Sequence, residues 1–136
     1  MPTSRNKELV HEFWKYFAID TGRALSMVSE DAVWKLGQAN GGDFDKPTIS
    51  KVLDAVISQF ASPAVFTMGS MTAEDNRVCV EIQGAAELTN GKRYDNKYCM
   101  VFTIHDGKIT RVHEYTDTFY ALNTLSVEGF KDHLAA

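Results

Sequence analysis

Several features that would narrow the function at once are scarce in this chain. Its 136 residues include only two cysteines, Cys79 and Cys99, which have neither CxxC nor metal-ligand spacing. We therefore expect two free thiols that pack as small apolar side chains in a reducing compartment, the cytoplasm. No stretch approaches the length of an apolar membrane-spanning helix, and the N-terminus has no apolar signal segment.

Basic residues are also few and scattered. The chain has 14 Lys and Arg against 18 Asp and Glu, a net charge of −4, without any cluster of Lys or Arg. Because nucleic-acid binding depends on clustered cations that neutralise phosphates, we expect no nucleic-acid partner and no anionic membrane partner. The four histidines are not spaced with one another or with a cysteine, so the sequence predicts no metal site.

The composition is that of a globular protein, with 44% hydrophobic and 24% charged residues. The length suits one domain, and no repeat or linker divides the chain, so we expect a single domain over residues 1–136. Eight Phe, five Tyr and two Trp are enough both to fill a core and to line a small-molecule pocket.

Helical periodicity is confined to the first half of the chain. Apolar residues recur at helical spacing over residues 4–18, with Ser4 as the expected N-cap. A short helix is expected over residues 21–28. A third helix should begin with Pro47 in its first turn and end at Pro63.

The other segments alternate between turn residues and runs of β-branched and aromatic residues, which is typical of strands. The predicted strands are residues 32–36, 64–71, 77–88, 93–104 and 108–118, with a loop over 37–46 and a last short helix over 127–134. Helices followed by a meander of strands predict an α+β fold. We expect a curved antiparallel or mixed sheet wrapped around the three helices, with a small-molecule pocket on its concave face.

Two hairpin turns decide which side chains share that face. A two-residue type I′ turn at positions 90–91 places side chains of two neighbouring strands together, whereas a longer, bulged loop at this turn gives the other register. These are Glu81, Gln83, Asn96, Tyr98 and Met100.

The second turn, at positions 106–107, leaves two registers open. A two-residue turn brings one set of side chains to the enclosed face: His113, Tyr115 and Asp117. A three-residue loop with a G1 bulge brings the other set: Val112 and Glu114. We favour the bulged form because it turns Arg111 away from the enclosed face.

The last third of the chain contains four motifs. They are Tyr94-Asp95-Asn96-Lys97-Tyr98, Val101-Phe102, Asp106-Gly107-Lys108-Ile109 and His113-Glu114-Tyr115-Thr116-Asp117-Thr118. Together with residues 30–34 as a first strand, they resemble the SnoaL-like proteins of the nuclear-transport-factor-2-like, or ketosteroid-isomerase-like, superfamily. The resemblance implies a cone-shaped domain with a deep apolar pocket, often a homodimer through the outer face of the sheet.

The resemblance also implies an acidic residue on the last strand that works as acid or base in cyclases and hydrolases of this superfamily, and Glu114 matches it. The epoxide hydrolases of the superfamily carry four further polar groups. At those positions this chain has Glu81, Gln83, Trp34 and Leu36, so the resemblance does not extend to epoxide hydrolysis.

These residues support one mechanistic hypothesis. If Glu114 and Glu81 are enclosed together, burial and mutual repulsion favour the protonated form, so that one is a general base while the other donates to an enolate oxygen. Tyr98 and Asn96 would donate to the same oxygen. Other expected substrate-binding residues are Trp14, Trp34, Gln83, Met100, Val112, His113 and Asp117.

Each assignment has a structural alternative. A Glu on an antiparallel strand more often faces solvent, Asp117 can cap local backbone, and Trp14 has the spacing of a core residue. The function we expect is a cofactor-independent isomerase, cyclase or lyase acting on a small apolar carbonyl compound. The alternative is a non-catalytic ligand-binding or dimerisation module of the same fold.

Overall fold

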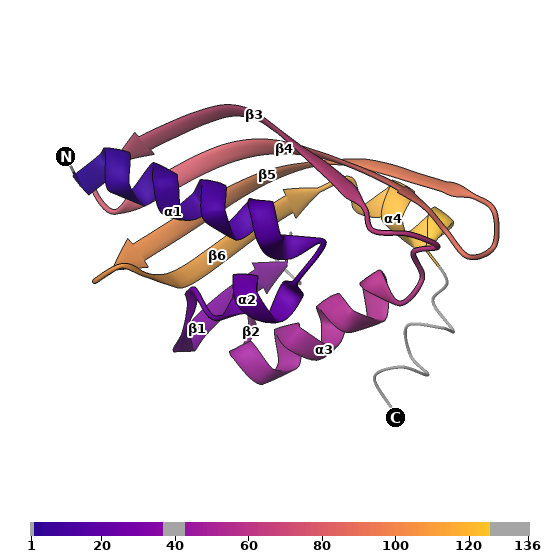
Figure 1. The fold of residues 1–136 in the computed structure, drawn as a ribbon, viewed down its shortest axis with the longest axis horizontal. Coiled ribbons are helices and arrows are strands. Elements are labelled where there is room, and N and C mark those ends of the chain that lie inside the picture. Colours follow the sequence, from indigo (N-terminus) through magenta and orange to yellow (C-terminus); the bar gives the residue numbers. More distant parts are fainter. Residues whose placement is uncertain (1, 37–42, 126–136) are drawn as a thin grey trace.

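A computed structural model describes residues 2–36 and 43–125, in which a curved six-stranded sheet packs against the helices (Figure 1). This is the α+β class that the sequence predicts, with three helices ahead of the long strands. The elements are α1 (Pro2–Phe17), α2 (Thr21–Leu25), β1 (Val28–Leu36), β2 (Asp43–Phe44), α3 (Lys46–Ile57), β3 (Val65–Glu74), β4 (Arg77–Glu87), β5 (Arg93–His105), β6 (Lys108–Thr116) and α4 (Thr118–Thr124).

The sheet is mixed, with the strand order β2-β1-β6-β5-β4-β3. Only β1 and β6 pair in parallel, and the other neighbours are antiparallel. The parallel pair is allowed because α3 and four strands separate β1 from β6 along the chain. The glutamate-bearing end of β6 is thereby held between β1 and β5.

The core lies between α1 and the concave face of the sheet. The apolar stripe of α1 buries Val10, Phe13, Trp14 and Phe17 completely or nearly so. Phe13 meets Phe102 of β5 with ring centroids 5.6 Å apart and an edge-on geometry. Burying this stripe fixes α1 across the sheet, so its later residues also form part of the wall described below.

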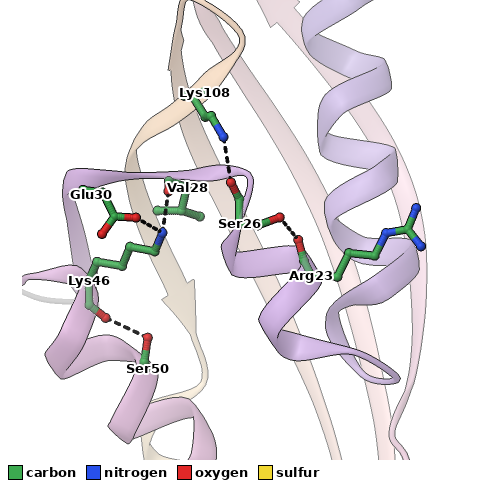
Figure 2. A network of polar contacts seen from close by, with 7 residues as sticks. All are labelled: Arg23, Ser26, Val28, Glu30, Lys46, Ser50 and Lys108. Atoms are coloured by element: carbon green, nitrogen blue, oxygen red, sulfur yellow. Dashed lines mark hydrogen bonds and ion pairs between the residues drawn. The ribbon is translucent and has the colours of Figure 1, made fainter.

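Lys46, the first residue of α3, ties that helix to β1 (Figure 2). Its Nζ donates to the Val28 carbonyl at 2.9 Å and to Oε1 of Glu30 at 2.8 Å. Lys108 of β6 donates to the carbonyl of Ser26 at 2.8 Å, just after α2. Exposed ion pairs stabilise little, so these contacts chiefly orient α3 and β1 on the sheet.

Three boundaries of the helices differ from the prediction. α1 begins at Pro2, so Ser4 lies within the helix and is not its N-cap, because proline itself suits the first turn. α3 holds Pro47 in its first turn, as predicted, but ends at Ile57 and not at Pro63. Residues 26–28, expected to end α2, lead into β1, which starts four residues earlier than expected.

The sequence reading did not predict α4, whose first residue was assigned to the preceding strand. The Asp117 side chain accepts from the backbone N of Tyr120 at 3.0 Å and so caps the N-terminus of this helix. Strand β2 was likewise placed in a loop. The helix expected over residues 127–134 lies outside the described residues.

The loop between β4 and β5 has three residues where two were expected. The backbone N of Leu88 donates to the carbonyl of Lys92 at 2.8 Å across this loop. Gly91 takes a φ of +86°, the left-handed region that glycine adopts without steric cost. The loop is therefore the longer hairpin form and not a type I′ turn.

That extra loop residue shifts β4 against β5. Glu81 lies opposite Cys99, and not opposite Met100 as expected. Because a slip of one residue moves a side chain to the other face of a sheet, Glu81 and Gln83 lie on the outer face.

The turn between β5 and β6 is shorter than predicted, but the inward position of Glu114 that we predicted from it is correct. Positions 106–107 form a two-residue turn with φ of 49° and 74°, not the three-residue loop that we favoured. A bulge at Thr110, just beyond the turn, then shifts the register by one residue. Met100 consequently lies opposite Glu114, and Glu114 and Val112 face inward as the bulged form predicted.

Candidate functional site

A cavity of about 450 Å³ lies between the concave face of the sheet and helices α1, α3 and α4. Its volume is within the range of small-molecule sites. Seven aromatic side chains form much of the wall: Trp14, Phe17, Trp34, Phe60, Phe66, Tyr94 and Tyr98. Aliphatic side chains of α3, of α4 and of the residue that follows α4 form another part of it: Ile49, Val52, Leu53, Val56, Ile57, Ala121, Leu122 and Leu125.

Gly84 on β4 makes room for two rings of this wall. A Cβ at Gly84 would lie 3.0 Å from a ring carbon of Phe66 and 3.3 Å from a ring carbon of Tyr98. A side chain at position 84 would therefore push both rings toward the cavity. The glycine is explained by this close approach and not by an unusual backbone angle.

Glu114 is the only charged residue among the described residues that line the cavity. It keeps some accessible surface because the cavity reaches it, yet protein surrounds its carboxyl closely. The indole Nε1 of Trp34 donates to its Oε1 at 3.3 Å. Burial raises the pKa of Glu114 to about 7, and the hydrogen bond from Trp34 opposes that rise only in part.

A pKa near 7 makes this carboxyl useful for proton transfer. Roughly half of the molecules carry the carboxylate and half the acid at neutral pH, so the group can accept or return a proton with little penalty. A carboxyl in this state within an apolar cavity is a typical acid/base candidate.

Two tyrosine hydroxyls face the same region from β5. The Tyr98 hydroxyl donates to that of Tyr94 at 3.4 Å, and Asn96 Nδ2 donates to the Tyr94 oxygen at 2.9 Å. One proton is shared within the tyrosine pair, so the other remains for donation to a ligand. Burial, foremost, and the nearby Glu114 raise the pKa of both tyrosines, which keeps them as neutral donors.

Other predicted site residues also lie at the cavity. Trp14, Trp34, Tyr98 and Met100 line it beside Glu114, as the inward face of their elements requires. Val112 faces inward too, but it is only 1% exposed and belongs to the core.

The outer face holds Glu81 and Gln83, which the expected register of the first hairpin had placed inside, and His113, which only the alternative form of the second turn had placed inside. Glu81 and Gln83 are exposed there and border a shallow groove with Lys97. His113 also faces outward, with its ring stacked on Tyr115 at a centroid distance of 4.0 Å and its Nδ1 3.0 Å from the Tyr115 hydroxyl. The two glutamates are thus on opposite faces, and a paired-carboxylate mechanism has no geometric basis here.

The side chains of Asn96 and Asp117 form hydrogen bonds within the protein. Asn96 is 3% exposed, and its Nδ2 donates to the Tyr94 hydroxyl oxygen at 2.9 Å and to the Asp117 carbonyl at 3.2 Å. Asp117 caps α4 and is exposed. Asn96 therefore orients a cavity tyrosine, and Asp117 holds a cavity helix.

Sequence reasoning missed Tyr94, Phe66 and most of the α3 and α4 wall. Tyr94 could have been found, because it lies two and four residues before Asn96 and Tyr98 on one strand and so shares their face. The α3 segment was predicted as a helix with Pro47 in its first turn, but none of its side chains was assigned to the pocket. The α4 wall depended on a helix that was not predicted.

The indole of Trp34 should tune the titration of Glu114. Trp34→Phe removes the donor that stabilises the carboxylate, so we expect the pKa of Glu114 to rise above about 7 by up to about one unit. Carbon NMR of the Glu carboxyl groups across a pH series measures this. Trp14→Phe is the matched control, since the buried Nε1 of Trp14 has no hydrogen-bond partner among the described residues. Equal shifts in both variants would contradict the assignment.

Within the described residues, no group of three or more His, Cys, Asp or Glu side chains is placed to hold a metal ion. Cys79 and Cys99 are free thiols on the outer face, with their Sγ atoms 3.6 Å apart. None of the helices in residues 2–36 and 43–125 is long and apolar enough to cross a membrane.

Comparison with known proteins gives a family and a fold. A model of the SnoaL-like domain matches residues 7–112, well over half of the chain. Curated protein sequences give no match.

Three solved structures with the same arrangement are informative. Bal32a, from a soil-derived mobile gene cassette, is 21% identical with a TM-score of 0.76 over 90% of this chain and 96% of its own. TerC, co-crystallised with polyporic acid, is 20% identical with a TM-score of 0.75 over 88% and 97%. A putative polyketide cyclase from Xanthomonas campestris pv. campestris is 21% identical with a TM-score of 0.72 over 93% and 100%. At such identities the likeness concerns the fold alone.

Proposed function

The chain belongs to the SnoaL-like domain family and has the nuclear-transport-factor-2-like fold, and we propose that it is an enzyme that moves a proton on a small, apolar carbonyl compound. Glu114 is the acid/base in this proposal. Isomerisation, cyclisation and elimination all begin with such a step. No organic cofactor takes part in it.

The observation that carries the proposal is a lone carboxyl in an aromatic cavity. Glu114 faces a volume of about 450 Å³, and burial brings its pKa to about 7. A carboxyl left in an apolar wall costs folding free energy, because its charged form is poorly solvated there. Use in proton transfer explains why such a costly group occupies the wall.

The proposed step begins with the ionised form of Glu114. A carboxylate oxygen takes the proton from the carbon next to the substrate carbonyl, the C–H electron pair becomes the enolate, and the negative charge moves to the carbonyl oxygen. Glu114 then returns the proton to another carbon in an isomerisation. In a cyclisation the enolate carbon attacks a second carbonyl, and the proton goes to the new alkoxide.

The tyrosine pair is proposed to hold the enolate oxygen. Tyr94 and Tyr98 share one proton between their hydroxyls and have one left to donate. Such a donor, aimed at developing charge in a site with little water, stabilises the transition state more than it would in solution. Asn96 supports the pair by fixing the Tyr94 oxygen.

The test uses β-tetralone, a bicyclic aromatic ketone with acidic α-protons, as a probe of stated chemistry. In deuterium oxide the protein should replace the α-protons by deuterium faster than buffer alone, as proton NMR measures. The rate should rise with pH through about 7 and level off above, because the carboxylate is the active form. Exchange no faster than in buffer at any pH would overturn the proposal for this probe class.

One observation favours the second candidate, a non-catalytic ligand-binding or dimerisation module. Glu81 lies on the outer face, so the lining that the structure describes lacks the second carboxyl that the two-glutamate mechanism requires. In a binding module Glu114→Gln would change only ligand affinity, whereas in an enzyme it would remove turnover.

Location and assembly belong to the same proposal. We place the chain in the cytoplasm, which the thiol state of Cys79 and Cys99 supports. We also propose a homodimer through the outer face of the sheet. The exposure of Tyr115 on that face, 45%, supports this.

A further inference from the structure

Among residues 2–36 and 43–125, the carboxyl of Glu114 has no cationic partner at the cavity. The lining residues that the structure describes include no Lys, Arg or His. Trp34 donates to Oε1, and Oε2 makes no hydrogen bond with any described residue. When ionised, this group is therefore a buried negative charge with one neutral donor from the described part of the chain, Trp34.

The walls around that charge are ring faces and edges. Trp14, Phe17 and Phe66 pack on one another with centroids 5.1 to 5.4 Å apart, and Tyr94 and Tyr98 lie on the sheet side. The face of an aromatic ring carries negative potential and attracts cations, most strongly in tryptophan. The Glu114 carboxylate and the aromatic rings thus both favour a positively charged ligand.

We propose that the cavity binds lipophilic amines in their protonated form, with the ammonium group paired to Glu114 and the hydrocarbon part against the aromatic wall. This inference rests on the proposed function only in that it uses the same cavity and carboxyl. The proton-transfer reaction does not require amines. They are a second class of ligand, which would compete with the carbonyl substrate for the same cavity.

The protonation state of Glu114 supports its pairing with an ammonium group. A neutral ligand leaves Glu114 free to take up a proton and avoid the cost of a buried charge, whereas an ammonium group compensates that charge directly. The ammonium loses water on entry, and the rings replace part of that solvation. The ligand needs an apolar hydrocarbon part, because the wall offers few polar partners.

The charge on Glu114 should control amine binding. The titratable groups that face it are Tyr94 and Tyr98 of β5, and burial raises the pKa of both, so they stay neutral. The lining residues of α1, α3, α4 and β1 are not titratable. The pH dependence of binding near neutrality is therefore that of Glu114.

The test compares β-aminotetralin with β-tetralol, which has the same ring system and a neutral hydroxyl in place of the ammonium. Isothermal titration calorimetry with the full chain should show that amine affinity rises about tenfold or more from about pH 5.5 to about pH 8.5, with little change for the alcohol. Glu114→Gln should weaken the amine about tenfold at the higher pH and leave the alcohol unaffected. Glu81→Gln, the same change on the outer face, should alter neither.

Three results would overturn the inference: an amine that binds no better than the alcohol at the higher pH, equal amine affinity in Glu114→Gln and the unsubstituted chain, or no amine binding at millimolar concentration. Deuterium exchange of β-tetralone separates this from the proposed function. Exchange without amine binding rejects only the amine site. Amine binding without exchange rejects only the enzymatic proposal.

Discussion

Glu114→Gln should lower the protein-catalysed deuterium exchange of β-tetralone by about a hundredfold or more, because a positioned acid/base group contributes roughly 10²–10⁴-fold. The amide keeps the shape of the side chain and an oxygen to accept from Trp34, but it cannot take a proton. Proton NMR in deuterium oxide measures the exchange rate, and titration of β-tetralol checks that the cavity still binds a neutral ligand.

Glu81→Gln is the matched control for that loss. It makes the same chemical change on the outer face, so its exchange rate should equal that of the unsubstituted chain. If Glu114→Gln kept the full rate, or if Glu81→Gln lost as much, Glu114 would not be the acid/base. A variant that loses exchange and alcohol binding together would indicate a damaged cavity, and the smaller change Glu114→Asp, which keeps the carboxyl, would then show whether partial exchange returns.

The same substitution should stabilise the fold in alkaline solution. The pKa of Glu114 is raised from 4.5 to about 7 in the folded chain, so folding favours the protonated form. Stability from this group is fully present below the unfolded pKa and is lost as pH rises through about 7, at a cost of about 3 kcal/mol once the carboxylate predominates. Glu114→Gln removes that cost.

Urea unfolding measures the effect. We expect Glu114→Gln to exceed the unsubstituted chain by about 3 kcal/mol in free energy of unfolding at about pH 8.5 and to equal it near about pH 4.5. Glu81→Gln, exposed to solvent, should show no such pH-dependent difference. A constant difference between Glu114→Gln and the unsubstituted chain across this pH range would mean that the carboxyl is not held in an apolar site.

These two predictions together mean that the carboxylate of Glu114 lowers the stability of the fold and at the same time supports proton transfer. A residue that weakens the fold when charged persists at such a site when the charged form has a use. A purely structural glutamate would gain nothing from its place between Trp34 and the aromatic wall. This is why the activity and stability of the same variant are informative as a pair.

The fold was predictable because its signals are local and repeated. The apolar stripes of α1 and α3 and the runs of alternating residues in the long strands give the element order directly. The parallel pairing of β1 with β6 is a long-range contact that local patterns do not specify, and it was not predicted from the sequence.

The candidate site was predictable only in part, because turn geometry decides it. Asn90-Gly91 is typical of a two-residue turn, and the one additional residue in the actual loop moved Glu81 to the outer face. The bulge at Thr110 compensated for a wrong turn assignment and left Glu114 inside. Bulges depend on how strands pack, so a single sequence gives little sign of them.

The roles of Asn96 and Asp117 show a second limit. Each looked like a ligand-binding group because it is polar and near the predicted pocket. Asn96 instead satisfies a buried tyrosine hydroxyl and a carbonyl, and Asp117 caps a helix that the strand-like residues around it concealed. Buried polar side chains are committed to such partners more often than to ligands.

The titration of Glu114 itself is the most direct test of this account, because exchange, alkaline stability and amine binding all depend on it. Carbon NMR of chain labelled at the Glu carboxyl, with Glu114→Gln to assign the resonance, follows that group alone through the pH range. We expect a midpoint of about 7. A midpoint near 4.5, the ordinary value, would contradict it.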